Sequence, residues 1–291
     1  MTSTAPGTAP TPTPAPTRAD DGLVLRRVSK SYESGRGATL ALDDVSLVVG
    51  RAQFVTIIGP SGCGKSTLLR IAAGLVRADS GEVSIFGEDP RAACANKHIG
   101  FVPQSPALLP WRTVLENVRL PLLVNRRATR GVPGDAGGLR DPADILAAFG
   151  LGEVLDKRPA QLSGGMQQRV AIARAFVFDP AVLLMDEPFS ALDELTREVI
   201  RYELLDLWST RRTTVLFVTH SVTEAVALSD AVVVMSPQPG RVSALVPVDI
   251  PRPRGELVEL TEDFRAIERR VRLELRTAAG SGGRAPGRDE Q

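Results

Sequence analysis

The sequence is poor in the residues that build metal centres and disulfide scaffolds. Its 291 residues include two histidines and two cysteines. They form neither a CxxC pair nor a Cys/His spacing suited to zinc. Cys63 lies inside a glycine-rich segment, where a disulfide would obstruct a ligand. We therefore expect both thiols to be free and the protein to work in a reducing compartment.

An excess of charge of one sign is also lacking. Lys and Arg number 35 against 34 Asp and Glu, which gives a formal net charge of +1. We therefore expect no nucleic acid partner and no anionic membrane surface as partner. The longest apolar runs, such as residues 231–235, have the size of strands and cannot span a bilayer. The N-terminus lacks the basic start and apolar middle of a signal peptide. Work at a membrane would then need a partner.

Strand-like and helix-like segments alternate between two low-complexity ends. Residues 1–20 are rich in Thr, Pro and Ala, and residues 278–291 in Gly and Arg, so both are predicted to be disordered tails, with inert linkers as the plain interpretation. The alternation between them indicates an α/β protein with a parallel-rich sheet. The expected strands are 23–28, 45–49, 54–58, 82–86, 98–102, 182–185, 215–218, 231–235 and 242–246. The expected helices are 65–73, 114–123, 143–149, 165–178, 193–209 and 223–228.

Strand signals are scarce between about residues 105 and 180, which we interpret as a helical insertion. Within it, residues 125–142 are rich in Gly and Arg and are expected to form an exposed loop. The main domain is expected over residues 21–250, followed by a helical extension over 251–277. A one-sided apolar pattern at 259–276 predicts a helix there, which either packs on the core or binds a partner.

One glycine-rich segment has the spacing of a phosphate-binding loop. Residues 59–66, GPSGCGKS, fit G-x-x-x-x-G-K-[ST] between an apolar strand and a helix, a context that disfavours a chance turn. Glycines let successive N–H groups face phosphate oxygens, and the helix N-terminus adds positive charge. We expect Lys65 to reach the β- and γ-phosphates of a nucleotide and Ser66 to bind Mg²⁺. The expected nucleotide-binding residues here are Gly59, Pro60, Ser61, Gly62, Cys63, Gly64, Lys65, Ser66 and Thr67.

An acidic pair ends a later apolar strand. Asp186 is placed to hold the Mg²⁺ shell. Glu187 emerges on a different side of the strand end and is the candidate general base for an attacking water. Such a base commonly contributes ~10²- to 10⁴-fold in rate. Two acids that merely cap a strand are the alternative, but the glycine-rich loop supplies the phosphate and metal that the acids would serve.

A third segment, LSGGMQQR at residues 162–169, lies between the loop and the acidic pair. Ser163 is a good helix N-cap, and a capped helix alone would explain it. The tandem Gly164 and Gly165 favour close approach of an anion to the backbone. Together the three segments resemble the ATP-binding cassette (ABC) family of transport ATPases, over about residues 23–246.

The resemblance implies a fold and a ligand. The fold is an α/β P-loop NTPase cassette with a parallel-rich core sheet, an antiparallel β subdomain and a helical insertion subdomain. The ligand is ATP with Mg²⁺, held by the loop of one copy and by the LSGG segment of another. ATP then joins two copies of the chain into a head-to-tail homodimer.

Four single residues match further positions of the family. Tyr32, expected just after a strand, matches an aromatic that stacks on adenine, although an edge-strand tyrosine would look the same. Gln104 matches a glutamine that touches Mg²⁺ and the water and links to the membrane partner. His220 matches a histidine that contacts the γ-phosphate, and Asp193 lies in a loop that crosses the dimer interface. Many relatives have an acidic residue where this sequence has Ser221. Serine is also a plausible helix N-cap at this position, so we still expect the protein to be active.

Two further segments, residues 108–117 and 234–242, resemble importers of nitrate, sulfonates, taurine and related small solutes. In the family the first segment lies against the membrane subunit, so Pro110 and Trp111 would contact it. An ordinary loop tryptophan that covers the helical insertion is the alternative.

The resemblance therefore implies an ATPase subunit at the cytoplasmic face of the cell membrane that couples hydrolysis to solute uptake. Its partners would be integral permease subunits and, indirectly, an extracytoplasmic solute-binding protein. The alternatives are an exporter-partnered cassette, a soluble cassette ATPase of nucleic-acid repair or translation, and a P-loop kinase. The single cassette, the near-zero net charge and the LSGG segment count against the last two.

Overall fold

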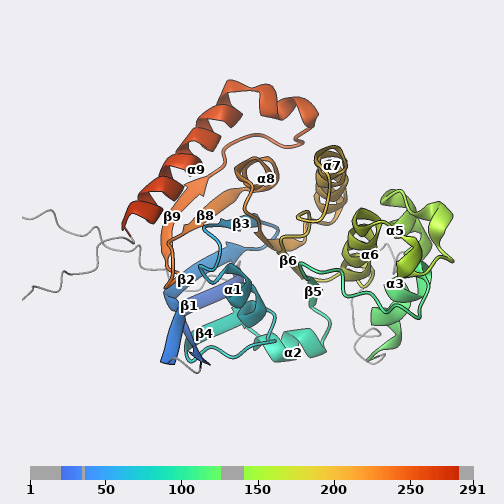
Figure 1. The fold of residues 1–291 in the computed structure, drawn as a ribbon, viewed down its shortest axis with the longest axis horizontal. Helices are drawn as coiled ribbons and strands as arrows, with labels where there is room; N and C mark the ends of the chain where they lie inside the picture. Colours follow the sequence, from blue (N-terminus) through green and yellow to red (C-terminus); the bar gives the residue numbers. More distant parts are fainter. Residues whose placement is uncertain (1–20, 35–36, 126–140, 282–291) are drawn as a thin grey trace, which may run out of the picture.

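Two sheets organise the chain. The computed structural model describes residues 21–34, 37–125 and 141–281 (Figure 1). The predicted tail 1–20, the greater part of the predicted loop 125–142 and residues 282–291 lie outside the described residues. One sheet has three antiparallel strands in the order β2-β1-β4, and the other has six in the order β5-β6-β7-β3-β8-β9. The expected α/β architecture is confirmed.

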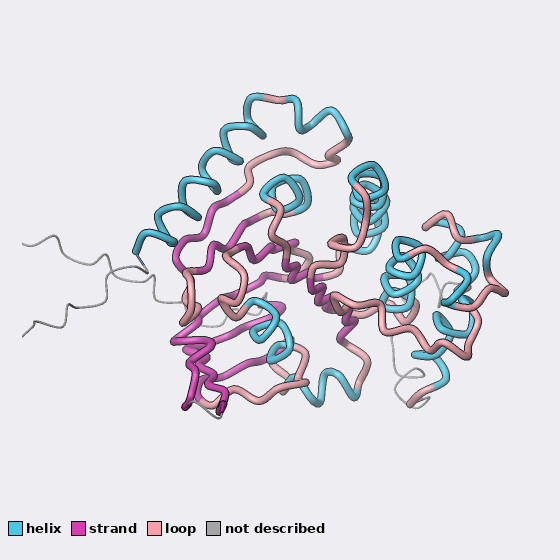
Figure 2. The backbone as a smooth tube through the Cα atoms, in the orientation of Figure 1, coloured by secondary structure: helices cyan, strands magenta, loops and turns pink. Residues whose placement is uncertain are grey.

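The six-stranded sheet is parallel except for its last pair, β8 and β9. Every residue of β3, β6 and β7 is buried, as expected for apolar strands in a sheet covered on both faces. Helix α1 lies between the two sheets, whereas α8 and α9 lie over the other face (Figures 1 and 2). The strands are β3 Phe54–Ile58, β5 Ile99–Val102, β6 Val182–Asp186, β7 Thr214–Val218, β8 Ala231–Met235 and β9 Val242–Pro247. The helices are α1 Lys65–Ala72, α7 Glu194–Arg211 and α8 Val222–Leu228.

The antiparallel sheet is larger than the sequence predicts. Strands β1 (Asp21–Ser34) and β2 (Gly37–Gly50) pair along their whole length, and β4 (Ser80–Ile85) joins the first half of β1. Polar residues and several register shifts break the alternation in the outer half of β1, which hides the strand in the sequence. Tyr32 therefore lies within β1, opposite Thr39, and not after the strand as expected.

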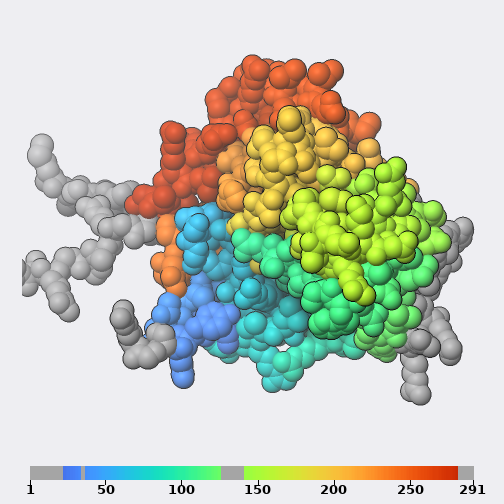
Figure 3. All heavy atoms as spheres, turned by 45° about the vertical axis from the view of Figure 1, so that its right-hand side comes forward, coloured from blue at the N-terminus to red at the C-terminus, as the bar shows by residue number. Residues whose placement is uncertain are grey.

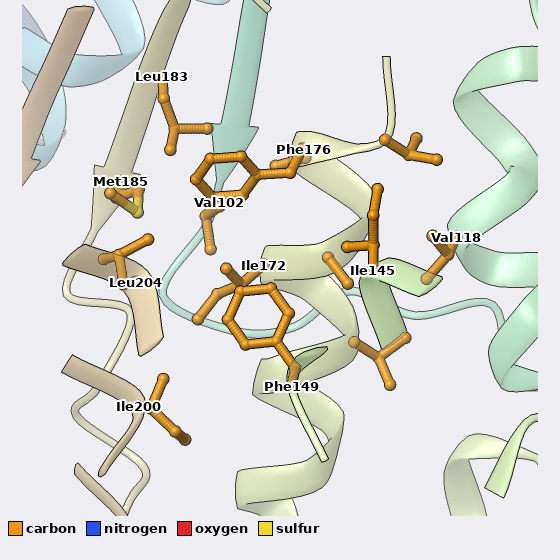
Figure 4. Packing of buried hydrophobic residues seen from close by; sticks show 14 of the residues in the cluster. Val102, Val118, Ile145, Phe149, Ile172, Phe176, Leu183, Met185, Ile200 and Leu204 are labelled. Atoms are coloured by element: carbon orange, nitrogen blue, oxygen red, sulfur yellow. The ribbon is translucent and has the colours of Figure 1, made fainter. Parts of the chain in front are cut away.

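The helical insertion projects from the side of the core sheet (Figure 1). It comprises α3 (Val114–Leu123), α5 (Pro142–Ala148) and α6 (Gly164–Phe176), with 3₁₀ turns η1 (Gly152–Val154) and η2 (Pro159–Gln161). No strand occurs in the described residues between 105 and 180. Figure 4 shows its apolar side chains meeting those of the sheet, and they belong to one buried cluster. The labelled residues are Val102, Val118, Ile145, Phe149, Ile172, Phe176, Leu183, Met185, Ile200 and Leu204.

The C-terminal helix covers the core from the outside (Figure 3). A 3₁₀ turn, η3 (Glu256–Leu260), precedes α9 (Glu262–Ser281), whose Phe264, Val271 and Ala278 are buried against α8, β8 and β9. Helix α9 thus packs on the core, the first of the two alternatives. Its predicted limits are wrong at both ends: it begins after the η3 turn, and the buried Ala278 extends the helix into the predicted tail.

One short helix was not expected. Helix α2 (Pro90–Ala95) begins at an N-cap, Asp89, whose side chain accepts from the Arg91 N–H, followed by Pro90 at the first helical position. This Asp-Pro start is a recognisable signal. None of the helices in the described part of the chain is long and apolar enough to cross a membrane.

An aromatic cluster stabilises the centre of the core sheet. The buried Phe217 ring lies 5.8 Å from Phe54 and 5.5 Å from Phe189, measured between ring centroids. We expect Phe217→Ala to lower the free energy of unfolding by about 3–5 kcal/mol, because it removes transfer energy and leaves a cavity. Denaturant unfolding followed by circular dichroism measures the change. Leu257→Ala, at a side chain 76% exposed, is the control and should cost under about 0.5 kcal/mol. Equal losses for the two variants would contradict the central role of Phe217.

Candidate functional site

The glycine-rich loop joins the buried strand β3 to α1, as the motif requires. Gly62 and Gly64 have φ of 77° and 94°, in the left-handed region that favours glycine. A Cβ on Gly64 would come within 2.6 Å of Leu42 Cδ2 and 2.8 Å of the Ala41 carbonyl oxygen. Both the conformation and the space at this position therefore require glycine. Residues 59–64 form the turn, and Lys65, Ser66 and Thr67 begin α1.

The Lys65 ammonium lies across the loop. Its Nζ donates to the carbonyl oxygens of Gly59 and Pro60, at 2.9 Å each, and lies 3.9 Å from Cys63 Sγ. Only 6% of Lys65 is exposed, and its partners in the loop are uncharged. The positive charge is therefore left for an anion such as phosphate. Both cysteines are free thiols, and burial raises the pKa of Cys63, partly opposed by Lys65.

The loop meets the end of β6 through one hydrogen bond. Ser66 Oγ donates to Asp186 Oδ1 at 2.8 Å. Asp186 is 3% exposed, and its burial raises the pKa of its carboxyl, although the Ser66 bond and the charge of Arg70 lower it in part. A hydroxyl and a carboxylate are oxygen ligands of the kind that Mg²⁺ prefers. No group of three or more His, Cys, Asp and Glu that could hold a metal occurs in the described residues.

Three polar side chains converge beside this pair. Gln104 Nε2 donates to Glu187 Oε2 at 3.4 Å, and His220 Nδ1 lies 3.3 Å from the same oxygen. These residues follow β5, β6 and β7, which are neighbours in the sheet. Glu187 has φ 45°, and its N–H donates to the Val218 carbonyl at 2.9 Å. The two carboxylates therefore have different partners: Asp186 accepts from Ser66, whereas Glu187 accepts from Gln104 and lies beside His220.

The LSGG segment begins α6 at an exposed surface. Ser163 Oγ accepts from the Met166 N–H at 3.2 Å and caps the helix. A Cβ on Gly165 would come 3.0 Å from Leu192 Cδ2, whereas one on Gly164 would meet nothing within 4 Å. Within the described residues, no contact of this chain explains a glycine at 164.

Two predicted residues lie apart from the converging groups. The Asp193 carboxylate caps α7 by accepting from the Thr196 N–H at 3.0 Å, and this bond lowers its pKa. Tyr32 is 41% exposed, with Lys30 Nζ 5.6 Å from its ring centroid. In the described residues, no hydrogen bond or ion pair joins Ser163, Asp193 or Tyr32 to the Lys65–Asp186–Glu187 cluster.

Gly240, which is not among the predicted site residues, packs against the glycine-rich loop. The Gly240 N–H donates to the Ala41 carbonyl, and its own carbonyl accepts from the Asp43 N–H, both at 3.0 Å. Arg241 pairs with Asp43 and fixes the same turn. A Cβ on Gly240 would overlap the carbonyl oxygen of Cys63. A Pro-Gly pair signals a turn in the sequence, but not what the turn touches.

Residues 42–190 match the protein family described as ABC transporter. An uncharacterized ABC transporter ATP-binding protein of Methanocaldococcus jannaschii is 45% identical to this chain, over 80% of this chain and 84% of the relative. The chain belongs to the ABC transporter family. The expected resemblance is confirmed, and the protein is an ABC ATPase.

Two further likenesses concern named proteins. The aliphatic sulfonates import ATP-binding protein SsuB of Bacillus licheniformis is 38% identical to this ABC ATPase, over 88% of this chain and 94% of the relative. A dimeric structure of the ATP-binding cassette MJ0796, in a post-hydrolysis state bound to ADP and Pi, matches with a TM-score of 0.68 at 34% identity. It covers 79% of this chain and 100% of that chain.

The contact between Gly240 and the loop can be tested in this ABC ATPase. We expect Gly240→Ala to weaken ATP binding at least about tenfold, or about 1.4 kcal/mol, because the added methyl displaces the loop at Cys63. Equilibrium binding of a fluorescent ATP analogue measures the loss. Gly255→Ala is the control, since a Cβ there meets nothing within 4 Å and φ is −105°. Wild-type affinity in Gly240→Ala would show that the loop does not depend on this turn.

Proposed function

We propose that this ABC ATPase is the ATP-hydrolysing subunit of an importer for a small solute of the nitrate, sulfonate or taurine type. It works as a homodimer beneath separate permease subunits, at the cytoplasmic face of the cell membrane. The convergence of Gln104 and His220 on Glu187, next to the Ser66–Asp186 pair, carries the catalytic part of this proposal. The import part is supported by the SsuB relative, which is named for the import of aliphatic sulfonates.

The residues fit a cation bound with the nucleotide. Ser66, Asp186 and the Gln104 amide oxygen would hold Mg²⁺, which neutralises charge on the β- and γ-phosphates when bound. The loop N–H groups and the Lys65 ammonium hold the phosphate oxygens. Phosphoryl transfer to water then needs positioning and charge neutralisation more than covalent chemistry.

The general base and its neighbours act on the attacking water. Glu187 takes a proton from this water as the water oxygen attacks the γ-phosphorus, and the bond to the ADP oxygen breaks. His220, within 3.3 Å of the Glu187 carboxylate, orients that carboxylate and reaches the γ-phosphate. Gln104, which follows the strand on the other side of β6, restrains the same carboxylate.

A second copy completes each site. The N-terminus of α6, at Ser163 and Gly164, is exposed and uncovered, which suits contact with the γ-phosphate held by the opposite copy. Asp193 lies on the loop that crosses between the copies. The dimeric MJ0796 cassette supports this arrangement by its likeness.

The helical insertion offers the surface for the permease. Trp111 is 67% exposed, so it does not cover the insertion as an ordinary loop tryptophan would. An exposed tryptophan is a natural interface anchor. A solute-binding protein would join the complex through the permease and not through this chain.

The assignment of the general base predicts a separation of binding from hydrolysis. We expect Glu187→Gln to bind ATP normally, to lose at least about 10²-fold in hydrolysis rate, and to accumulate as an ATP-bound dimer, because the amide cannot accept the proton. Lys65→Ala should lose ATP binding itself. Phosphate release, ATP binding and size-exclusion chromatography measure the three properties. Glu153→Gln, at an exposed carboxylate, is the matched control. A normal hydrolysis rate in Glu187→Gln would rule out Glu187 as the base.

The membrane partner can be captured directly. We expect Glu187→Gln protein, purified from detergent-solubilised membranes, to bring a multi-span permease and a secreted solute-binding protein, identified by mass spectrometry. Adding Trp111→Ala should reduce permease recovery at least about tenfold by removing an interface anchor, whereas adding the exposed-site control Leu273→Ala should not. The recovered binding protein is then screened with nitrate, taurine, alkanesulfonates and pyrimidines. Recovery of only soluble partners or nucleic acid would favour the soluble cassette ATPase.

A further inference from the structure

A buried carboxylate outside the catalytic cluster holds the turn that carries His220. Glu224, in the first turn of α8, is 4% exposed. Thr219 Oγ1 donates to Glu224 Oε2 and accepts from the Ser221 N–H at 3.0 Å. Ser221 Oγ in turn accepts from the Glu224 N–H at 3.3 Å. The residues on both sides of His220 are therefore tied to Glu224.

The other oxygen of Glu224 faces α7. Arg197 Nε lies 3.6 Å from Glu224 Oε1, as an ion pair without a hydrogen bond. Arg197 Nη2 donates to the Leu192 carbonyl at 3.0 Å, and the Arg197 N–H donates to the Asp193 carbonyl at 2.9 Å. One guanidinium thus holds the turn before α7 and reaches the carboxylate behind His220.

The same turn also packs on the LSGG segment. The Leu192 side chain is 5% exposed and lies so close to Gly165 that a Cβ there would be 3.0 Å from it. A continuous set of contacts therefore runs from the LSGG segment through Leu192 and Arg197 to Glu224, and on to the His220 turn.

The ion pair between Glu224 and Arg197 matters because Glu224 is buried. Desolvation raises the pKa of Glu224, and the Thr219 hydroxyl and Arg197 oppose that rise. Arg197 also pairs with the exposed Glu194 at 3.2 Å, so loss of Glu224 still leaves Arg197 one anionic partner, whereas loss of Arg197 leaves a buried carboxylate uncompensated. Arg201, next along α7, lies 2.5 Å from Glu259 of the C-terminal extension. Arg197 is the one cation within ion-pair distance of Glu224 in the described residues.

We propose that Glu224 and Arg197 are positioning residues that couple the two ATP sites of the dimer. The proposal rests on the homodimer proposed above. In it, Glu187 and His220 act on the ATP held by their own loop, whereas the LSGG segment and the Asp193 loop act on the ATP of the second copy. The Glu224–Arg197 pair joins these two sets inside one subunit, so occupation of one site sets the geometry of His220 in the other.

The test separates coupling from binding and from folding. Glu224→Gln keeps the shape and an oxygen for Thr219 but removes the ionic attraction, and Arg197→Lys keeps the charge but loses the fork that reaches Leu192. In the full-length chain we expect Glu224→Gln to keep the KM for ATP within about twofold. Its kcat should fall about 10- to 100-fold, the scale of a small misplacement, and its Hill coefficient for ATP should fall to about 1. Asp179→Asn, which breaks the 2.6 Å pair with Arg211 at the far end of α7, is the control.

The double variant decides between coupling and mere structure. If Glu224 and Arg197 act as a unit, the double variant that combines Glu224→Gln and Arg197→Lys should have a kcat no lower than that of the more impaired single variant. Wild-type kcat and Hill coefficient in a folded Glu224→Gln would overturn the proposal, as would equal losses in ATP affinity and kcat. If Glu224→Gln does not fold, Arg197→Lys alone must lower the Hill coefficient, and its failure to do so overturns the proposal. A Hill coefficient of 1 in the wild-type protein would also overturn the proposal. In that case the homodimer of the proposed function would fail as well, because its two ATP sites would not cooperate.

Discussion

Parallel pairing of β6, β7 and β3 is the constraint on which the rest of the structure depends. These strands are buried on both faces, so their register is fixed by the apolar side chains that they place in the core. Because the strands run the same way, their carboxyl ends meet at one edge. The glycine-rich loop, the Asp186–Glu187 pair and His220 follow these three ends. The order and direction of the strands therefore suffice to bring these groups together.

Two charged groups of the site are held by partners within the chain. The Lys65 ammonium rests on two carbonyl oxygens, and the Asp186 carboxylate rests on the Ser66 hydroxyl. Groups fixed in this way need little reorganisation when phosphate charge develops, which is the main electrostatic means of lowering a reaction barrier. The aromatic cluster at the centre of the core sheet supplies part of the stability that such an arrangement costs.

The sequence predicts the parts of this structure that depend on local patterns. Strands β3 and β8 and helix α3 have the predicted limits, because short apolar runs and a Thr-x-x-Glu start mark them. The outer half of the β1–β2 hairpin escapes prediction, since its polar residues are held by backbone pairing and not by burial. The contact of Gly240 with the loop and the Arg197–Glu224 pair join segments far apart in the chain, so no local pattern signals them. The roles of Ser163 and Asp193 came from the family resemblance, because within one copy they only cap helices.

The left-handed backbone at Glu187 bears on how this protein can evolve. A non-glycine residue at φ 45° carries a strain of about 1–3 kcal/mol, which glycine or asparagine would relieve at that position. Selection for thermal robustness alone would therefore favour replacing the side chain that we propose as the general base. If Glu187 is the general base, as proposed above, glutamate at this position trades part of the stability of the protein for turnover. A degenerate copy, freed from the need to hydrolyse, would be expected to lose this residue early and to become more stable as a result.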